Sequence, residues 1–257
     1  MRGDLDETRS LIRVGGEDRE SFLQALVTND LDKLSEGLVY AALLTPQGKY
    51  LADFFLVPEA DSILIDVDGA LAPDLLRRLT LYRLRAKVTI EAVELPVVRG
   101  LGDLPEGAFA DPRDPALGWR AYGAEPVETA GIDWTALRVA HGIPEQGSEL
   151  IPDDSYILEF DFERLNGVDF RKGCFVGQEI VARMKHKTTL RKGLARLRID
   201  GAAEPGTEIT AGGKTVGRLG TQSGSAALAH VRFDRAQGDM QAGPARVSPL
   251  EPQPAAG

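Results

Sequence analysis

The spacing of apolar residues changes at residue 192, and this change constrains the fold more than any other feature of the chain. Before it, short β-rich runs alternate with segments of helical periodicity. After it, short strand-like runs are separated by glycine-rich turns, at 193–199, 208–210, 214–221 and 226–233. We therefore expect an α+β region over 1–191, a small antiparallel β-barrel or sandwich over 192–242, and a proline-rich tail over 243–257 that is mobile or extended.

The first region alternates between predicted strands and predicted helices. Apolar runs at 38–45 and 50–57 flank Pro46-Gln47-Gly48-Lys49, a turn sequence that predicts a β-hairpin. Periodicity predicts further strands at 62–67, 87–93 and 119–122, and helices at 17–27, 73–84 and 132–141. The segment 95–126 is rich in proline and glycine, so we expect two short strands within loops there, and a division into two lobes near 95–125.

Cys174 is the only cysteine among the 257 residues, which excludes an internal disulfide. It supplies one of the several ligands that a metal or cluster site needs, so a metal bound at Cys174 must be shared with a partner. The three histidines lie far apart and form no i, i+4 pair, which argues against a zinc hydrolase.

No apolar run approaches the ~20 residues that a membrane helix needs. The first residues, Met1-Arg2-Gly3-Asp4-Leu5-Asp6-Glu7, lack the apolar core of a secretory signal and the acid-free composition of a transit peptide. These features predict a cytoplasmic protein without a membrane partner.

Basic residues are concentrated in one stretch of a chain whose formal net charge is -9. Residues 171–198 contain nine basic residues and one acid, Glu179. A short basic segment in an acidic chain favours a local anion site, or else a solvated basic face. Direct binding of nucleic acid is not expected, because it usually needs a basic domain. An RNA-contacting module stays open as a further interpretation.

One glycine-containing segment holds the residues best suited to chemistry. Gly173 and Gly177 permit a close approach of the backbone, and 178–185 is a run of helix formers, so Cys174 is expected just before a helix N-terminus. The helix dipole and two adjacent basic residues would then favour the thiolate. A lone cysteine is otherwise most often a small buried apolar residue, and this alternative stays open.

The same segment resembles a known signature. Lys172-Gly173-Cys174-Phe175-Val176-Gly177-Gln178-Glu179, followed by Val181-Ala182-Arg183, is similar to the K-G-C-[YF]-x-G-Q-E signature of the YgfZ family, folate-binding proteins that support iron-sulfur cluster assembly. Thr28-Asn29-Asp30-Leu31, Gly37 and the hairpin from Gly48 to Asp53 resemble the start of the wider aminomethyltransferase (glycine-cleavage T-protein) superfamily. Leu137-Arg138-Val139-Ala140-His141-Gly142-Ile143-Pro144 is similar to its central R-x-x-x-G-[IL]-P element. The resemblance extends from about residue 10 to residue 235.

This resemblance implies a fold, a ligand and partners. The fold is an α+β, T-protein-like cloverleaf, in which two folate-binding lobes and a small C-terminal antiparallel β-barrel surround a cavity for tetrahydrofolate. The function is that of a tetrahydrofolate-binding accessory factor for the assembly or repair of iron-sulfur proteins. The expected partners are A-type iron-sulfur carrier proteins and iron-sulfur enzyme clients, which links the chain to processes such as tRNA modification.

The resemblance also implies roles for particular residues. Cys174 would be the functional thiolate, acting as a nucleophile or as a ligand of an iron-sulfur cluster shared with a carrier. The loop that presents it would be shaped by Lys172, Gly173, Phe175, Gly177, Gln178, Glu179 and Arg183. Folate would be bound by Asn29, Asp30, Asp53 and Arg138.

Departures from the transferase branch argue against aminomethyl transfer. T-proteins carry an acidic pair where this chain has Ala52-Asp53, and a glutamate that grips the pterin where it has Ala140. They also carry a residue other than cysteine at position 174, and arginine at 178. Carboxylates that would orient the pterin and the amine are therefore partly absent. A folate-dependent one-carbon transferase that uses Asp53 is the alternative function.

Overall fold

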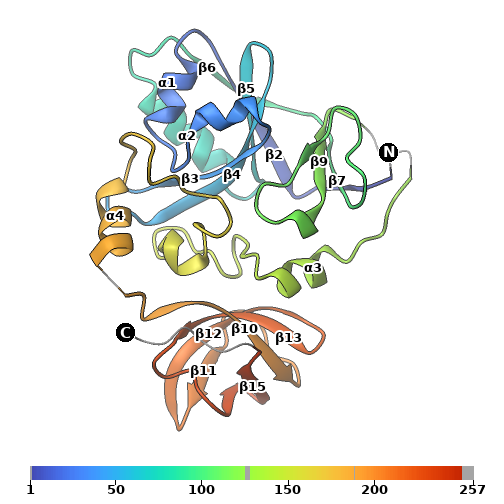
Figure 1. Ribbon diagram of the computed structural model, residues 1–257, viewed down its shortest axis with the longest axis vertical. Coiled ribbons are helices and arrows are strands. Elements are labelled where there is room, and N and C mark those ends of the chain that lie inside the picture. The colour runs from blue at the N-terminus through green and yellow to red at the C-terminus, as the bar shows by residue number, and fades with distance from the viewer. Residues whose placement is uncertain (1, 125–127, 188, 251–257) are drawn as a thin grey trace. The chain divides into compact units, whose positions relative to one another are not determined.

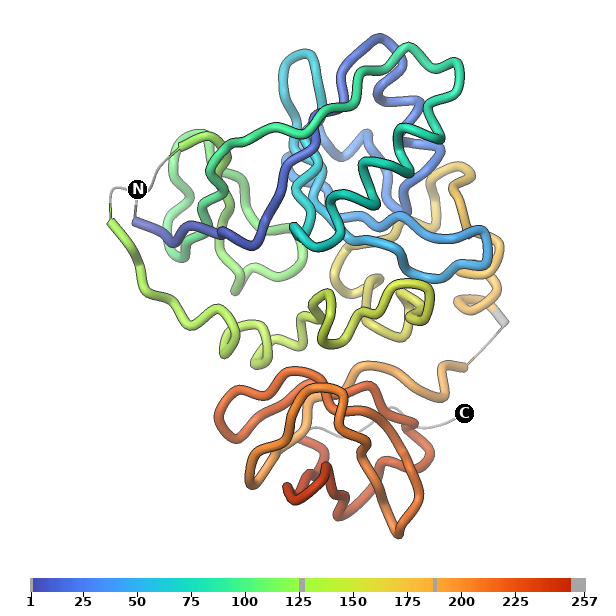
Figure 2. The backbone as a smooth tube through the Cα atoms, turned by 180° about the vertical axis from the view of Figure 1, so that it is seen from behind, coloured from blue at the N-terminus to red at the C-terminus, as the bar shows by residue number. Residues whose placement is uncertain are grey.

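The computed structural model describes residues 2–124, 128–187 and 189–250. The chain divides into two compact units. Unit 1 comprises Met1–Ile132 and Glu163–Gln178, and unit 2 comprises Asp133–Phe162 and Glu179–Gly257. The chain thus passes from unit 1 to unit 2 after Ile132, returns at Glu163 and leaves again after Gln178 (Figure 1 and Figure 2).

Unit 1 is built on a five-stranded antiparallel sheet with the order β3-β4-β5-β2-β6 (Figure 1). Its strands are β2 (Arg9–Gly15), β3 (Val39–Leu44), β4 (Tyr50–Pro58), β5 (Ser62–Asp68) and β6 (Thr89–Val93). The predicted hairpin is confirmed, because β3 pairs with β4 around a turn in which the amide of Thr45 donates to the carbonyl of Lys49. The strand β2, which lies between β5 and β6, was not among the predicted strands.

Two helices bury their apolar faces in the core of this sheet. They are α1 (Arg19–Gln24) and α2 (Ala72–Tyr82), and both were predicted with longer bounds. Phe22 and Leu23 of α1, and Leu75 and Leu79 of α2, belong to the core, as the helical spacing of apolar residues requires. A short 3₁₀ helix, η1 (Leu31–Ser35), follows α1 and is capped by the side chain of Asp30.

A second, four-stranded sheet completes unit 1. Its order is β1-β7-β9-β8, formed by β1 (Asp4–Leu5), β7 (Val97–Gly100), β8 (Phe109–Ala110) and β9 (Trp119–Tyr122), with the 3₁₀ helix η2 (Pro115–Leu117) before β9. The buried Trp119 ring packs directly on Gly100, where an added Cβ would lie 2.2 Å from a ring carbon. Gly100 is therefore required for a close approach rather than for a turn.

Unit 2 contains a closed six-stranded antiparallel barrel with the order β10-β13-β12-β11-β14-β15. The strands are β10 (Lys192–Asp200), β11 (Glu208–Ala211), β12 (Lys214–Ser223), β13 (Ala226–Arg232), β14 (Met240–Ala242) and β15 (Ala245–Pro249). Buried and more exposed residues alternate along β10, so that Leu197 and Ile199 enter the barrel core. Closure leaves no free sheet edge.

The remaining elements include two α-helices that the sequence analysis predicted. The helix α3 (Trp134–His141) ends at Gly142, which adopts the left-handed conformation expected of a C-terminal glycine. The helix α4 (Gln178–Lys187) follows the signature segment. The 3₁₀ helix η3 (Ile157–Phe160) lies between them in the chain.

Two boundaries differ from the sequence-based prediction. The tail expected at 243–257 is wrong for Ala245–Pro249, which forms β15 and pairs with both β10 and β14. Pro244 precedes this strand and Pro249 ends it, so the intervening amides remain free to pair. Residues 251–257 lie outside the described part of the chain.

The second difference is that Asp133–Phe162 groups with the barrel rather than with the rest of 1–191. A carboxylate oxygen of Glu149 accepts a hydrogen bond from the amide of Thr221 in β12 at 2.6 Å. Such long-range contacts have no local sequence signal. Within the described residues, no helix is long and apolar enough to cross a membrane.

Candidate functional site

Thr28 joins the returning segment Glu163–Gln178 to the main sheet of unit 1. Its hydroxyl donates to the carbonyl of Gly167 at 2.6 Å and accepts from the amide of Ala42 in β3 at 2.8 Å. Its own carbonyl accepts from the amide of Asp169 at 3.0 Å. The side chain is fully buried, so this motif residue fixes the position of the segment that leads into the signature.

Asn29 extends the same attachment. Its side-chain nitrogen donates to the carbonyls of Tyr40 and Asn166, at 2.8 and 2.6 Å. Its side-chain oxygen accepts from the amide of Asp30 at 2.9 Å and from Nζ of Lys33 at 2.8 Å. The two donors and two acceptor positions of a side-chain amide are therefore all used within the protein. Asn29 positions backbone in the structure, and its predicted folate contact stays a prediction.

Lys172 of the signature is buried and holds three carbonyls of the α1 region. Its Nζ donates to the carbonyl oxygens of Gln24, Val27 and Asn29 at 2.8, 2.6 and 2.9 Å. An ammonium has three donors, so this arrangement satisfies it completely. Burial lowers the pKa of Lys172 to about 8, and the nearby carboxylate of Asp30 limits the decrease. Lys172 thereby fixes one end of the signature loop.

Asp169 forms a second polar attachment before the signature. Its carboxylate lies 2.7 Å from Nζ of Lys33 and accepts from the amide of Arg171 at 2.7 Å. Burial alone would raise the pKa of Asp169, but the hydrogen bonds from Lys33 and Arg171 lower it below its ordinary value. The side chain of Arg171 remains 92% exposed. The backbone before Lys172 is thus held by ionised groups.

Cys174 is exposed, while the residues after it are anchored. Phe175 is buried beneath the Lys172 ammonium, which lies 5.4 Å from the centre of the ring. Val176 packs against the core of unit 1. The alternative that Cys174 is a buried apolar residue is therefore wrong. The loop presents the thiol to solvent between fixed points.

Gly177 ends the loop in a conformation that requires glycine. Its φ is +84°, and an added Cβ would lie 2.6 Å from the carbonyl oxygen of Thr45 in the hairpin turn. Gly173 is different, because an added Cβ would meet no atom within 4 Å. The close backbone approach predicted at both glycines therefore occurs only at Gly177.

The expected electrostatic support for a thiolate is weaker than the sequence suggested. The Lys172 ammonium is directed to backbone carbonyls, and α4 begins at Gln178, four residues after Cys174. Helix-dipole effects act mainly within the first turn. Glu179 and Arg183 form an exposed ion pair at 3.2 Å, as expected for an i, i+4 spacing. The feature that sets the Cys174 thiol apart is its exposure on a loop whose neighbouring residues are anchored.

The basic residues of 171–198 are divided between the two units, and at least four of the nine make contacts within the protein. Lys172 is buried, Arg183 pairs with Glu179, and Lys192 lies 3.4 Å from the carboxylate of Glu159. Arg196 donates to the carbonyl of Ala140. These four residues contact different elements of the protein. Their closeness in the sequence therefore does not by itself create an anion site.

Asp53, a predicted folate residue, lies near the end of a buried polar chain. Its two carboxylate oxygens accept from the hydroxyls of Tyr40 and Tyr50, at 2.9 and 2.6 Å. Burial, reinforced by Asp53, raises the pKa of both tyrosines well above the ordinary value, so the hydroxyls remain donors. Each carboxylate oxygen retains a further acceptor position.

The other two predicted folate residues are committed to protein partners. The carboxylate of Asp30 accepts from the side chain of Gln24 at 2.8 Å and from the amide of Asp32 at 3.2 Å. Arg138 belongs to unit 2, where it donates to Glu149 and to the carbonyl of Ile143, both at 2.9 Å. Asn29 and Asp53 thus contact opposite ends of Tyr40, its backbone carbonyl and its hydroxyl, while Arg138 contributes to the packing of unit 2.

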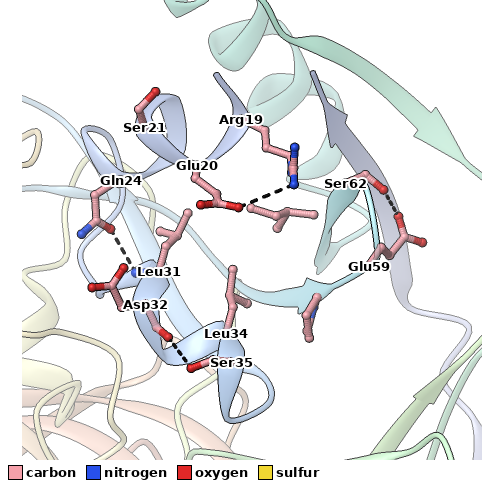
Figure 3. A pocket seen from close by; sticks show the side chains of 12 residues that line it. Arg19, Glu20, Ser21, Gln24, Leu31, Asp32, Leu34, Ser35, Glu59 and Ser62 are labelled. Atoms are coloured by element: carbon pink, nitrogen blue, oxygen red, sulfur yellow. Dashed lines mark hydrogen bonds and ion pairs between the residues drawn. The ribbon is translucent and has the colours of Figure 1, made fainter. Parts of the chain in front are cut away.

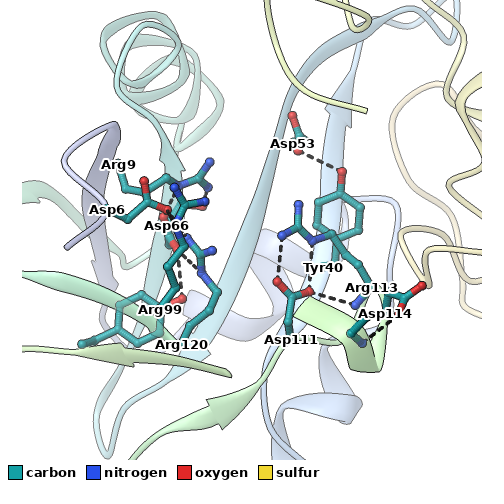
Figure 4. Close-up of polar contacts among 12 residues, drawn as sticks. Asp6, Arg9, Tyr40, Asp53, Asp66, Arg99, Asp111, Arg113, Asp114 and Arg120 are labelled. Carbon is teal, nitrogen blue, oxygen red and sulfur yellow. Dashed lines mark hydrogen bonds and ion pairs between the residues drawn. The ribbon is translucent and has the colours of Figure 1, made fainter. Parts of the chain in front are cut away.

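A buried charge cluster between the two sheets of unit 1 escaped the sequence analysis (Figure 4). Asp66 of β5 accepts from Arg9 at 2.6 Å, from Arg120 at 3.2 Å and from the Tyr122 hydroxyl at 2.9 Å. Asp6 lies 3.0 Å from Arg120 and balances it from the other side. These residues are scattered in sequence, so only the fold reveals that they are neighbours.

Three guanidinium groups surround the ring of Phe55 beside this cluster. Arg9, Arg113 and Arg120 lie 5.8, 4.7 and 4.6 Å from the ring centre. Arg113 is held by Asp111 at 2.7 Å and also faces Tyr40 at 5.5 Å (Figure 4). Cation–π contact and paired carboxylates together make these buried charges tolerable. The cluster joins the sheets and borders the Asp53 region.

The described part of unit 1 includes the following two cavities. One, of about 440 Å³, is lined by Asn29, Lys33, Leu38, Tyr40, Phe109 and Asn166, together with neighbouring residues. The other, of about 590 Å³, has an apolar floor that includes Leu31 and Leu34, and a rim of polar side chains bonded to one another or to nearby backbone (Figure 3). Both have the size of small-molecule sites. Of these two, only the first is lined by a residue of the predicted folate set, Asn29.

The sequence is similar to named assembly factors over most of its length. It is 32% identical over 276 residues to the human protein "Iron-sulfur cluster assembly factor IBA57, mitochondrial", covering 90% of this chain and 78% of that one. The mouse protein of the same name is 31% identical, with the same coverage. The homologue from Mycosarcoma maydis is 31% identical, and the match spans about half of its length, 55%.

The barrel and the whole fold each have a match of their own. Residues 191–256 match the family described as "CAF17, C-terminal beta-barrel domain". The glycine cleavage system aminomethyltransferase T from Bartonella henselae has a similar structure, with a TM-score of 0.76, 14% sequence identity, and coverage of 95% of this chain and 83% of that one. The predicted T-protein-like α+β fold with a C-terminal antiparallel barrel is thereby confirmed.

Proposed function

Because the chain belongs to the IBA57/YgfZ/CAF17 family of iron-sulfur cluster assembly factors, we propose that it assists the assembly or repair of iron-sulfur proteins through Cys174. In this proposal the thiolate supplies one ligand of a cluster that an A-type carrier holds with its own ligands. Iron-sulfur enzymes are the final recipients. The cluster is cargo passed between proteins, not a resident cofactor.

The exposure of Cys174 between anchored residues carries this proposal. A shared ligand must reach into another protein's site while its own backbone stays fixed. The three hydrogen bonds of Lys172 and the buried Phe175 supply the fixed frame, and the exposed thiol supplies the reach. Cys174 alone cannot complete a cluster site, since the chain has no second cysteine.

The test is anaerobic mixing of the full chain with an A-type carrier that holds a cluster. We expect the visible absorption and circular dichroism of the cluster to change, and the two proteins to elute together. Cys174→Ser should abolish both effects and also fail to restore iron-sulfur enzyme activity in cells that lack the native protein. Because the side chain is exposed, this variant should keep its free energy of unfolding within about 0.5 kcal/mol.

A relocated thiol provides the matched control. Ala60→Cys in the Cys174→Ser background restores one exposed cysteine to the same unit, in the turn between β4 and β5. It should not restore the spectral change, because the signature loop no longer presents the thiol. Full activity of Cys174→Ser would overturn the proposed role of the cysteine.

We also propose that tetrahydrofolate binds in unit 1 near Asp53. In support, the cavity beside Asn29 and Tyr40 combines apolar and aromatic walls with a few polar groups, which suits a pterin ring. Asp53 does not line this cavity but accepts from the hydroxyl of Tyr40, which does, and its free acceptor positions suit ring N–H donors. Bound there, tetrahydrofolate would contribute one-carbon chemistry or only stability. The chain's own residues would bind and orient it.

Calorimetry and thermal denaturation with tetrahydrofolate test this ligand. We expect weak, saturable binding that raises the melting temperature by mass action. Asp53→Asn should weaken it, whereas Asp61→Asn, an exposed acid of the same unit, should not. An amine donor should give no methylenetetrahydrofolate, in keeping with Ala52 and Ala140. Absence of binding at millimolar ligand would contradict the proposal.

A further inference from the structure

Leu84, just after helix α2, adopts a backbone conformation that leucine rarely adopts. Its φ is +44°, in the left-handed region where a helix C-terminus normally carries glycine. Among the described residues, the other non-glycine residues with positive φ are Asp153, Asp161 and Asn166, whose short polar side chains tolerate it. Leu84 is thus the bulky exception.

The side chain of Leu84 contributes almost nothing to the fold. It is 89% exposed, the highest fraction among the exposed large apolar residues of the described chain. Glycine at this position would relieve the backbone without exposing any core. Strain held at a side chain with no packing role is a signature of function rather than stability.

Leu84 does not stand alone on the surface. Leu81 is 60% exposed, because Leu75 and Leu79 of the same helix are the residues that turn toward the core. Leu81 lies in the last turn of α2, and Leu84 follows two residues after the helix ends, so both exposed side chains belong to the C-terminal end of this helix. Together they form an apolar spot next to the end of α2.

Unpaired arginines flank these leucines. Arg77 and Arg78 are paired with Asp74, and Lys87 with Glu17. Within the part of the chain that the structure describes, Arg83 and Arg85 have no ion pair. The segment 75–88 contains no acidic residue, although the whole chain has a net charge of -9. The local surface is therefore apolar and positive.

We propose that Leu81, Arg83, Leu84 and Arg85 form a docking surface, the leucine–arginine patch, for a protein partner that presents carboxylates beside an apolar side chain. The two leucines would be covered by the partner's apolar group. The two arginines would pair with its carboxylates, which Arg does well through its planar fork.

The observations favour a protein over a membrane or a nucleic acid. An anionic membrane would be repelled by the acidic remainder of the chain, and two leucines offer little to insert. A nucleic acid offers phosphates but no apolar group to cover the leucines. This proposal does not depend on Cys174, so it stands or falls separately from the proposed function.

The experiment uses the full chain and a defined probe. The probe is a fluorescein-labelled helical peptide with leucines along one face and glutamates beside them. A matched peptide carries glutamine in place of glutamate. Fluorescence anisotropy should show saturable binding of the acidic peptide that weakens as salt is raised, and much weaker binding of the glutamine peptide.

Variants of the patch separate its role in binding from any role in stability. Leu84→Gly should weaken peptide binding by about tenfold while raising the melting temperature, since glycine accepts the left-handed backbone. The double variant Arg83→Gln, Arg85→Gln should weaken binding and remove its salt dependence. Leu104→Ser, at an exposed leucine outside the patch, and Cys174→Ser should bind as the original chain does.

The proposal would be overturned by any of four results. One is the absence of saturable binding of the acidic peptide, and another is equal binding by Leu84→Gly. The third is binding to vesicles of phosphatidylcholine and phosphatidylglycerol with none to the peptide, which would assign the patch to a membrane. The fourth is a lower melting temperature for Leu84→Gly, which would show that Leu84 serves the fold.

Discussion

Nζ of Lys172 lies 2.6 Å from the backbone carbonyl oxygen of Val27, although 145 residues separate the two in the chain. The contact holds the segment Glu163–Gln178 against the residues that follow α1 within unit 1. It also makes the signature lysine part of the frame that presents Cys174. The signature therefore places a buried anchoring lysine and an exposed thiol two residues apart.

Lys172→Met should destabilise the protein by about 3 kcal/mol near pH 7. The variant leaves the carbonyls of Gln24, Val27 and Asn29 without their common donor in a buried site. Urea denaturation at equilibrium measures this difference. Arg171→Gln, at the exposed neighbouring position, is the control and should change stability by less than about 0.5 kcal/mol. Equal stability of Lys172→Met and the original chain would contradict the anchoring role.

The stability contributed by Lys172 should increase with pH above about 8. Burial lowers its pKa to about 8 in the folded protein, from an ordinary value of 10.5. Between these values the unfolded chain binds a proton that the folded chain does not, so the free energy of unfolding rises with pH. The stability difference between the original chain and Lys172→Met should therefore grow from pH 8 to pH 10. A difference independent of pH would show that the lysine keeps its ordinary pKa.

Gly177→Ala should destabilise unit 1 by about 2 kcal/mol and disturb the presentation of Cys174. The substituted residue would need a φ of +84°, and its Cβ would meet the carbonyl oxygen of Thr45 at 2.6 Å. Thermal denaturation and the rate of thiol alkylation measure the two effects. Gly173→Ala is the matched control, because its Cβ would enter open space. Similar losses in both variants would contradict this distinction.

Asp66→Ala should cost about 4 kcal/mol, because it removes the ion-pair partner of the buried Arg9 and leaves Arg120 with only Asp6. Tyr122→Phe removes only one hydrogen bond to the same carboxylate and should cost about 1 kcal/mol. Denaturant unfolding compares the two variants. Comparable, small losses would mean that the cluster is not needed to join the sheets.

The sequence predicted those elements whose pairing or packing is determined by residues close together in the chain. The hairpin of β3 and β4 has a turn signal between two apolar runs, and α2 and α3 have clear apolar faces. β15 was missed because its flanking prolines resemble a flexible tail, while its pairing partners lie far away in the chain.

The resemblance identified Cys174 and the residues that shape its loop, Lys172, Phe175 and Gly177 among them, but not the contacts by which they hold it. The residues of the signature identify the loop, but nothing local indicates that the Lys172 ammonium reaches back to α1. The same limit applies to Arg138, whose partner Glu149 and neighbour Thr221 assign it to unit 2. Direction and distance between remote side chains are properties of the fold.

The segment Asp133–Phe162 belongs to the same unit as the barrel but is synthesised before it. Glu149 leaves the ribosome 72 residues before Thr221, the barrel residue whose amide donates a hydrogen bond to the Glu149 carboxylate. At about 5 to 20 residues per second, that interval lasts roughly 4 to 14 s. For this time α3 and the segment after it have been made but have no barrel to pack on. A ribosome that pauses before β12 would therefore leave the middle of the nascent chain as its least protected part, open to chaperones and proteases, even though its N-terminal sheet is already complete.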